Sequence, residues 1–182
     1  GATLYVTLEP CCHRGKTPPC TDLLIERKIK KVVIGAFDPN PLVSGAGVAK
    51  LQQAGIEVVT GVLQGECLKL IEAFRHYIQT KRPFVVLKTA MSLDGKTATV
   101  SGESQWITGK AARDDVQLLR GELAGIMVGI NTVLLDDPSL TCRVVGGHNP
   151  RRIIVDSNLR IGLTSKVLQD QEDNQTIIAV TE

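Results

Sequence analysis

Three of the five cysteines of this 182-residue chain lie close together, in residues 9–20 with the sequence EPCCHRGKTPPC. Two thiolates at the end of a strand and the start of a helix, in a loop fixed by prolines and a glycine, can supply two corners of a tetrahedral zinc site. A catalytic zinc ion needs three protein ligands and an open position for water. His13 is the nearest candidate for the third ligand, but its place in the middle of the loop also allows a contact with ligand. The pattern therefore predicts half of a metal site, and a pair of inert buried thiols is the alternative.

A second group of candidate residues lies in two loop-like segments, residues 88–96 (KTAMSLDGK) and 101–108 (SGESQWIT). Small and hydroxylated residues between a strand and the start of a helix allow close approach of phosphate or ribose, since exposed N–H groups and the helix dipole favour anions. No G-x-G-x-x-G sequence follows a strand, so a Rossmann dinucleotide site is not indicated. By themselves these segments are weak evidence for a ligand site.

Alternating strand and helix patterns surround both groups of residues. Runs of β-branched and apolar residues predict strands at residues 2–8, 31–36, 56–60, 84–88, 124–129, 152–156 and 176–181. Apolar residues at helical spacing, with capping signals, predict helices at residues 21–30, 47–54, 65–77 and 108–123. Thr108 is the expected N-cap of the last of these helices. Strands that alternate with helices predict α/β layers around parallel sheets.

The polar residues 79–83, QTKRP, interrupt this alternation and predict a boundary between two domains, residues 1–80 and 81–182. The first strand begins without a preceding turn, and the last strand reaches the end of the sequence. We therefore expect further parts of both sheets to lie outside this sequence. The chain would then join the C-terminal part of one α/β domain to the N-terminal part of another.

The composition argues against several classes of function. The 21 basic and 19 acidic residues are spread along the chain and give a formal charge of +2, so no electrostatic footprint for nucleic acid or an anionic membrane is present. One tryptophan, two tyrosines and three phenylalanines are too few for base-stacking platforms. No apolar stretch approaches the roughly 20 residues of a membrane span. We expect a cytoplasmic protein without nucleic-acid or membrane partners, in which clustered cysteines bind metal or catalyse.

The sequence EPCCHRGKTPPC resembles the cytidine-deaminase superfamily, in the extended form of its riboflavin-biosynthesis members. The resemblance implies that Cys11 and Cys20 bind Zn²⁺ and that Cys12 is not a ligand. In that superfamily the third ligand and the catalytic glutamate belong to an H-x-E sequence, which this chain lacks. No catalytic residue is therefore assigned within the chain, and the H-x-E is expected upstream. Residues 38–47 resemble the loop on the substrate side of the same group.

Four further sequences, SLDGK, SGESQWIT, DVQLLR and GINTVLLDDPSLTCR, resemble the reductase domain that follows the deaminase in bacterial riboflavin-biosynthesis proteins, whose fold is similar to dihydrofolate reductase. The resemblance implies substrate contacts from Ser104, Arg120, Leu140 and Arg143, with the arginines suited to a ribose phosphate. It implies NADPH contacts from Ala90, Trp106, Thr132, Asp136 and Ser157. The glycine-rich segment that completes the family's NADPH site is expected beyond residue 182.

We therefore expect the C-terminal part of a cytidine-deaminase-like three-layer α/β domain, followed by the N-terminal part of a dihydrofolate-reductase-like α/β domain. The resemblance implies zinc-dependent hydrolytic deamination of a phosphoribosylated diaminopyrimidinone and NADPH-dependent reduction of its ribose to a ribityl chain, with the chain itself incomplete for both. A nucleic-acid deaminase and an inert zinc-binding or pseudoenzyme module stay open as alternatives. Deaminases of this superfamily commonly pair through their sheets, so a homo-oligomer is also considered.

Overall fold

The computed structural model describes residues 1–169 and 175–181, and the chain forms two compact units, Gly1–Leu87 and Lys88–Glu182. The domain boundary expected after residue 80 would lie at the end of helix α4, Glu72–Thr80. Its exact place stays a prediction. Each unit is described by itself below.

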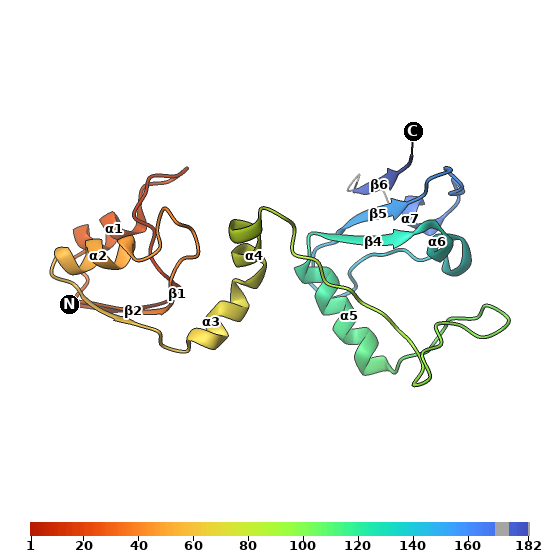
Figure 1. Ribbon diagram of the computed structural model, residues 1–182, viewed down its shortest axis with the longest axis horizontal. Coiled ribbons are helices and arrows are strands. Elements are labelled where there is room, and N and C mark those ends of the chain that lie inside the picture. Colours follow the sequence, from red (N-terminus) through yellow and green to blue (C-terminus); the bar gives the residue numbers. More distant parts are fainter. Residues whose placement is uncertain (170–174, 182) are drawn as a thin grey trace. The chain divides into compact units, whose positions relative to one another are not determined.

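Within the described residues, each unit contains three strands and the helices that precede, connect or follow them in the chain (Figure 1). The first unit contains β1 Thr3–Leu8, α1 Cys20–Glu26, β2 Lys31–Ala36, α2 Ala46–Gln53, β3 Glu57–Thr60, α3 Gln64–Leu70 and α4 Glu72–Thr80. The second unit contains α5 Lys110–Glu122, β4 Gly125–Gly129, α6 Ile130–Asp136, β5 Arg151–Val155, α7 Lys166–Gln169 and β6 Thr176–Ala179.

The first sheet has the order β1-β2-β3 with parallel strands, as the alternation of strands and helices predicted. Its central strand β2 is buried on both faces. Val32 and Ile34 are fully buried and belong to one apolar cluster with Leu51 of α2 and partly buried residues of α1. On the opposite face Gly35 lies against Cys67 of α3. Helices α1 and α2 therefore cover one face of this sheet and α3 the other, which gives the three layers expected (Figure 1).

Gly35 shows how closely α3 approaches the sheet. A Cβ atom at this position would lie 2.1 Å from the Sγ atom of Cys67 and 2.9 Å from the carbonyl oxygen of Thr7. Any side chain would therefore push the helix or the neighbouring strand away. Cys67 is buried and unpaired, so its role here is packing.

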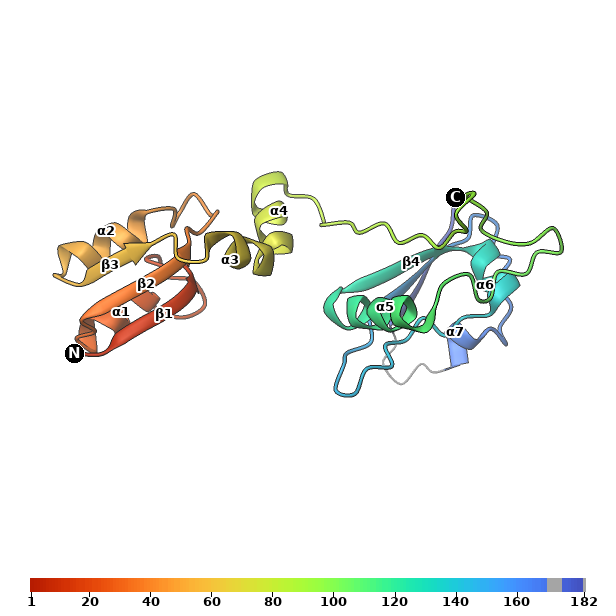
Figure 2. The same ribbon diagram turned by 90° about the horizontal axis from the view of Figure 1, so that it is seen from below.

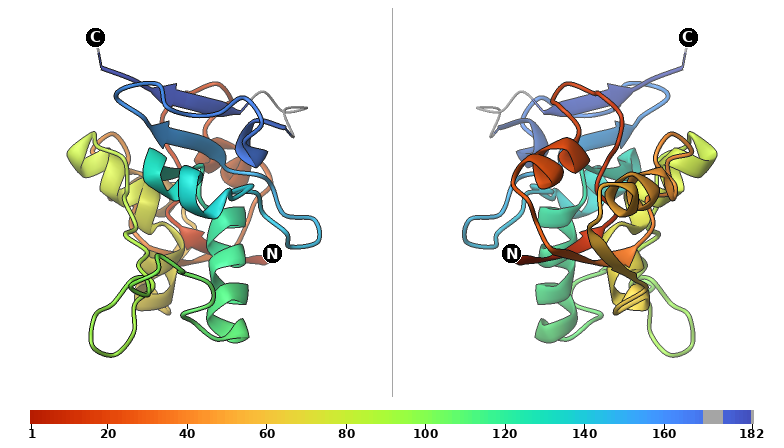
Figure 3. Two further views of the ribbon diagram at one scale, coloured as in Figure 1. Left: turned by 90° about the vertical axis from the view of Figure 1, so that its right-hand side faces the viewer. Right: turned by 90° about the vertical axis from the view of Figure 1, so that its left-hand side faces the viewer.

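The second sheet has the order β4-β5-β6, again parallel. One face carries the core of the unit, made by Ile154 of β5 together with residues of α6, α7 and the loop after α6 (Figure 2). These core residues are Ile130, Val133, Leu140, Ile154 and Val167. The neighbouring strands β5 and β6 run side by side (Figure 3), and β6 places Ile177, 47% exposed, next to Ile153.

Several elements differ from those expected from the sequence. Residues 84–88 form no strand, because they pair with no strand among the described residues and Val85 and Leu87 are exposed. Helix α5 begins after Gly109, which takes the N-cap position in place of Thr108 and makes no side-chain hydrogen bond. The expected helix 65–77 divides at Ile71 into α3 and α4. Helices α6 and α7 were not anticipated.

Among the described residues, no helix combines the length and the apolar character that a membrane span requires.

Ile154 tests the core of the second unit because it is completely buried on the central strand. Replacement by alanine should lower the free energy of unfolding by about 2–5 kcal/mol, through lost burial and the cavity left behind. Urea denaturation followed by circular dichroism measures this change. Ile177→Ala on the adjacent strand is the matched control and should cost much less, since Ile177 is half exposed. Equal losses in the two variants would show that the core is placed wrongly.

Candidate functional site

Cys11 and Cys20 are brought together by the loop that joins β1 to α1. The backbone N–H of Cys20, the first residue of α1, donates to the Sγ atom of Cys11 over 3.3 Å. The backbone N–H and the hydroxyl of Thr21 both donate to the Cys11 carbonyl oxygen, over 3.1 and 3.2 Å. Three hydrogen bonds therefore close the loop, so that residues nine positions apart in the sequence present adjacent thiols.

The two thiols influence each other's chemistry and fit two corners of a zinc site. A hydrogen bond with the Cys11 thiol, and then burial, raises the pKa of the Cys20 thiol. A metal ion bound here would replace the thiol protons, since metal-bound thiols are deprotonated. Within residues 1–169 and 175–181, however, no third histidine, cysteine or carboxylate completes a metal-binding cluster with them.

The other two candidates in the loop are placed differently. The Cys12 thiol points to the carbonyl oxygen of Leu42, 3.8 Å away, and its expected role as a non-ligand stays a prediction. The Nδ1 atom of His13 is buried and has no hydrogen-bond partner in the described structure. Among the described residues, His13 and the two thiols therefore do not form a three-membered donor set.

Glu9 is a buried carboxylate whose role the sequence did not reveal. Only 3% of it is exposed, and it accepts three backbone N–H groups from the segment that follows β2. Its Oε2 atom accepts from Asp38 over 3.3 Å and from Gly45 over 3.0 Å, and its Oε1 atom accepts from Val48 over 3.0 Å. Because Val48 lies in the first turn of α2, the carboxylate also satisfies a free N–H group at the start of that helix.

The segment held by Glu9 is the one that resembles a substrate-side loop. Within it Asp38 accepts the N–H of Asn40 over 2.8 Å, and Asn40 accepts the N–H of Leu42 over 3.1 Å. The start of α2 approaches closely, since a Cβ atom on Gly47 would lie 2.2 Å from the carbonyl oxygen of Pro10. The loop and the cysteine-bearing segment are therefore fixed against each other at the carboxyl ends of β1 and β2, where parallel sheets place their ligand sites.

In the second unit several candidates also lie at the carboxyl ends of parallel strands. Thr132 is in the first turn of α6, which follows β4 directly, and Ser157 follows β5. Gly129 and Val155, the last residues of these strands, are partners in the sheet, so the two loops leave it side by side. Both side chains are exposed at this edge.

Ser104 and Asp136 are the two candidates in direct contact. The Ser104 hydroxyl donates to Oδ1 of Asp136 over 2.7 Å and ties the loop before α5 to the last residue of α6. An expected substrate contact and an expected NADPH contact are thus connected by one hydrogen bond.

Arg120 and Arg143 form a second close pair. Nη1 of Arg120 donates to the carbonyl oxygen of Thr141 over 3.0 Å, while its Nε is buried without a partner. Burial, and then the positive charge of Arg143, lowers the pKa of Arg120. Two neighbouring cations with a free donor are suited to bind an anion such as a phosphate.

The remaining candidates are more dispersed. Leu140 is buried in the core cluster with a positive φ of 56°, so its side chain packs inside and only its backbone could meet a ligand. Trp106 is 68% exposed and lies under the guanidinium of Arg113, a neighbour that no sequence motif indicated. Ala90 is half-buried in an irregular segment.

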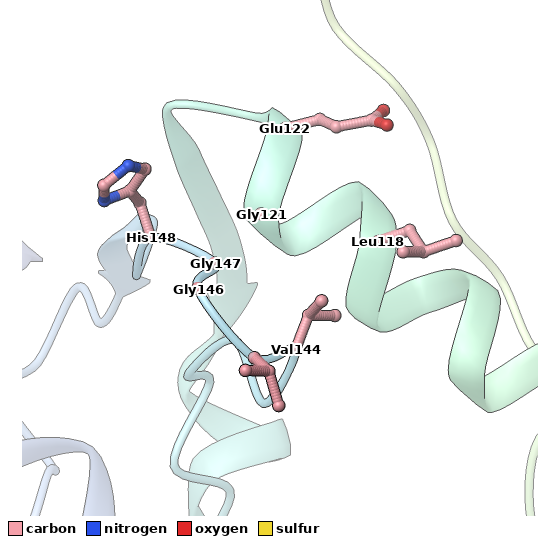
Figure 4. A pocket seen from close by; sticks show the side chains of 8 residues that line it. Leu118, Gly121, Glu122, Val144, Gly146, Gly147 and His148 are labelled. Carbon is pink, nitrogen blue, oxygen red and sulfur yellow. The ribbon is translucent and has the colours of Figure 1, made fainter.

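A shallow pocket of about 240 Å³ lies between the end of α5 and the loop of residues 144–148, which precedes β5 (Figure 4). Leu118, Gly121, Glu122, Val144, Val145, Gly146, Gly147 and His148 line it. None of the candidate site residues is among them, and the lining is largely apolar. We therefore assign the candidate site to the polar clusters above and not to this pocket.

Comparison with known families decides between the expected classes. Residues 1–36 match the model of the cytidine and deoxycytidylate deaminase zinc-binding region. Residues 83–182, more than half of the chain, match the model of the RibD C-terminal domain. The chain belongs to the RibD family. This confirms the resemblance stated from the sequence motifs.

Individual RibD proteins match both units together. The riboflavin biosynthesis protein RibD of Actinobacillus pleuropneumoniae is 58% identical over 98% of this chain and 48% of its own length, and that of Aquifex aeolicus is 51% identical over 100% of this chain and 51% of its own length. A solved structure from Thermotoga maritima, described as a diaminohydroxyphosphoribosylaminopyrimidine deaminase/5-amino-6-(5-phosphoribosylamino)uracil reductase, is 50% identical. It matches with a TM-score of 0.86 over 98% of this chain and 50% of that chain, which confirms the expected fold class. The chain spans about half the length of the relatives that it matches.

Glu9→Gln tests whether the buried carboxylate fixes the two loops. The amide would direct its NH₂ group at backbone N–H donors, so the free energy of unfolding should fall by about 1–3 kcal/mol for each donor left unsatisfied. Thermal or urea unfolding measures the loss. Glu57→Gln is the matched control, because Glu57 is 58% exposed and pairs with Lys31, a contact worth about 0–1 kcal/mol. If the two variants unfold alike, Glu9 does not have this role.

Proposed function

We propose that the protein carrying this chain is a bifunctional enzyme of riboflavin biosynthesis. Its first activity is zinc-dependent hydrolytic deamination of a phosphoribosylated diaminopyrimidinone. Its second is NADPH-dependent reduction of the ribose of that product to a ribityl chain. The observation that carries the proposal is the pairing of Cys11 with Cys20, in a chain whose second unit matches the RibD C-terminal domain.

The deaminase half is supported by the loops at the carboxyl edge of the first sheet. Cys11 and Cys20 would hold two positions on the zinc ion, which when bound activates water for attack on the pyrimidine ring. Glu9 would keep the substrate-side loop at a fixed place beside the two thiols through its three hydrogen bonds. The third ligand and the proton-transferring glutamate are expected from an H-x-E sequence outside this chain.

The reductase half is supported by the two polar clusters of the second unit. Arg120 and Arg143 would bind the ribose phosphate, and Ser104 would orient the sugar while bonded to Asp136. NADPH supplies the hydride. The remaining contacts with NADPH are proposed for Ala90, Trp106, Thr132, Asp136 and Ser157, and a contact of Leu140 with substrate is proposed through its backbone.

The same proposal places the protein in the cytoplasm and gives it a small-molecule substrate. The cytoplasmic location is supported by the five free cysteines, since cytosolic proteins keep their thiols reduced. A homo-oligomer stays a prediction.

Cys11→Ser tests the deaminase half, in the full product of the gene that contains this chain. Loss of one soft ligand should remove bound zinc and lower ammonia release from the pyrimidine substrate by more than about 100-fold. NADPH oxidation with the deaminated substrate should be unchanged. Metal analysis and the two activity assays measure these effects.

Cys12→Ser is the matched control, since Cys12 is the adjacent thiol and points to a backbone carbonyl. It should keep both zinc and activity. Ammonia release that survives the loss of Cys11 would contradict the proposal. If the unsubstituted protein binds zinc but releases no ammonia from any substrate, the inert zinc-binding module is favoured. If it releases ammonia from RNA and not from the pyrimidine, the nucleic-acid deaminase is favoured.

Arg143→Gln tests the proposed phosphate contact. Charge-assisted hydrogen bonds contribute about 1.5–3 kcal/mol, so the KM of the reductase for its phosphorylated substrate should rise roughly 10- to 100-fold with little change in kcat. Arg151→Gln is the control, because Arg151 is an exposed arginine at the amino end of β5 that is not among the candidate residues. An equal KM in both variants would remove Arg143 from the site.

A further inference from the structure

Trp106 lies in an unusual position for a large aromatic residue. It is 68% exposed, in the irregular segment that precedes α5. The guanidinium carbon of Arg113 lies 4.6 Å from the centre of its indole ring. An exposed aromatic ring against a single cation has little packing to hold it, so its orientation depends strongly on that contact.

Arg113 is itself anchored. It belongs to the first turn of α5, and its Nη1 group donates a hydrogen bond to the carbonyl oxygen of Thr108. The guanidinium is therefore tied to the backbone two residues after Trp106 while it lies over the ring. One face of the indole is covered by Arg113, and the large exposed fraction leaves the opposite face open to solvent.

We propose that Arg113 is a positioning residue for the cofactor: it holds the Trp106 ring so that the open face can stack against one of the planar rings of NADPH. The inference rests on the proposed function, in which Trp106 contacts NADPH. Arg113 acts through Trp106, because its guanidinium is engaged by the indole and by the Thr108 carbonyl. A planar ligand on the open face would complete a stack of guanidinium, indole and ligand ring, an arrangement that aromatic and cation–π contacts both favour.

The first part of the test needs no cofactor. Trp106 is the only tryptophan of the 182-residue chain, so the tryptophan fluorescence of the chain reports on this ring alone. Arg113→Met keeps an aliphatic side chain and removes the guanidinium, and the fluorescence anisotropy should fall because the ring gains freedom. Arg113→Lys should recover part of the anisotropy, since lysine keeps the charge but not the planar group.

Lys110→Met is the matched control. Lys110 lies one turn earlier on the same helix and is 82% exposed, and it pairs with Asp114 over 2.6 Å. This variant also removes one positive charge from the start of α5, but it leaves the Trp106 contact intact. Its anisotropy should equal that of the unsubstituted chain.

The second part measures NADPH binding to the full product of the gene, through the fluorescence of NADPH. Arg113→Met should raise the Kd and the KM for NADPH by about two- to fivefold, the worth of a cation–π contact at an exposed site, and leave kcat unchanged. Lys110→Met should change neither. If the unsubstituted protein binds no NADPH, the proposed function fails and this inference fails with it.

The other outcomes separate the two claims. NADPH binding that is equal in the unsubstituted protein and in Arg113→Met overturns the inference alone, whether or not the anisotropy changes. A weaker affinity without any change in anisotropy also overturns it, because Arg113 would then act on the cofactor and not through the ring. A Lys110→Met variant as weak as Arg113→Met would show that only the local charge matters.

Discussion

The candidate site of the first unit depends on the burial of one charge. The Glu9 carboxylate lies only two residues before Cys11, and it is removed from water by the segment that follows β2. A buried carboxylate is tolerated only when its oxygens are hydrogen-bonded. Here three backbone N–H groups, from a loop and from the first turn of α2, meet this need. The loop cannot move away without leaving the charge unsatisfied, so the thiol of Cys11 and the substrate-side loop keep a fixed relation. The close approach at Gly47 has the same origin, because a helix start that donates to Glu9 must also lie against Pro10.

In the second unit the loops that carry the candidate residues are also held in place by polar contacts, but these contacts are weaker and more exposed. Its candidate residues lie on loops, and single polar contacts such as the one from Ser104 to Asp136 join segments far apart in the sequence. The hydrophobic cluster around Ile154 fixes the sheet and α6, and the positions of Thr132 and Ser157 follow from the parallel pairing of β4 and β5. Among the described residues, no member of this cluster comes from the loop before α5, which is joined to the helices by side-chain contacts from Ser104 and Trp106. We therefore expect the position of this loop to be sensitive to single substitutions at these contacts.

The sequence predicted the central elements well because their signals are local. The run KVVIGA at Lys31–Ala36 is apolar and β-branched throughout, as a strand covered on both faces must be, and the structure forms a strand over the same residues. Residues 84–88 have a similar composition, but a strand also needs a neighbour, and composition does not report one. The spacing of apolar residues did not indicate the break at Ile71 or the short helix α6 either. Among site residues, Cys11 and Cys20 could be proposed from the family resemblance of their loop, whereas the contacts of Glu9 and Arg113 come from segments that folding brings to them.

The pair of Arg120 and Arg143 is unfavourable for the stability of the fold but suited to bind an anion. Burial of Arg120 imposes a desolvation cost on its charge, and the positive charge of Arg143 adds repulsion, so the pKa of Arg120 is lowered. Within the described residues neither arginine forms a salt bridge, and the buried Nε of Arg120 has no partner. A fold selected for stability alone would place an acidic side chain there. Such local violations are expected at functional sites, where the rest of the fold compensates for the cost. A bound anion would remove both the repulsion and the unsatisfied donor, so relief of this unfavourable energy would add to the affinity for the proposed phosphate.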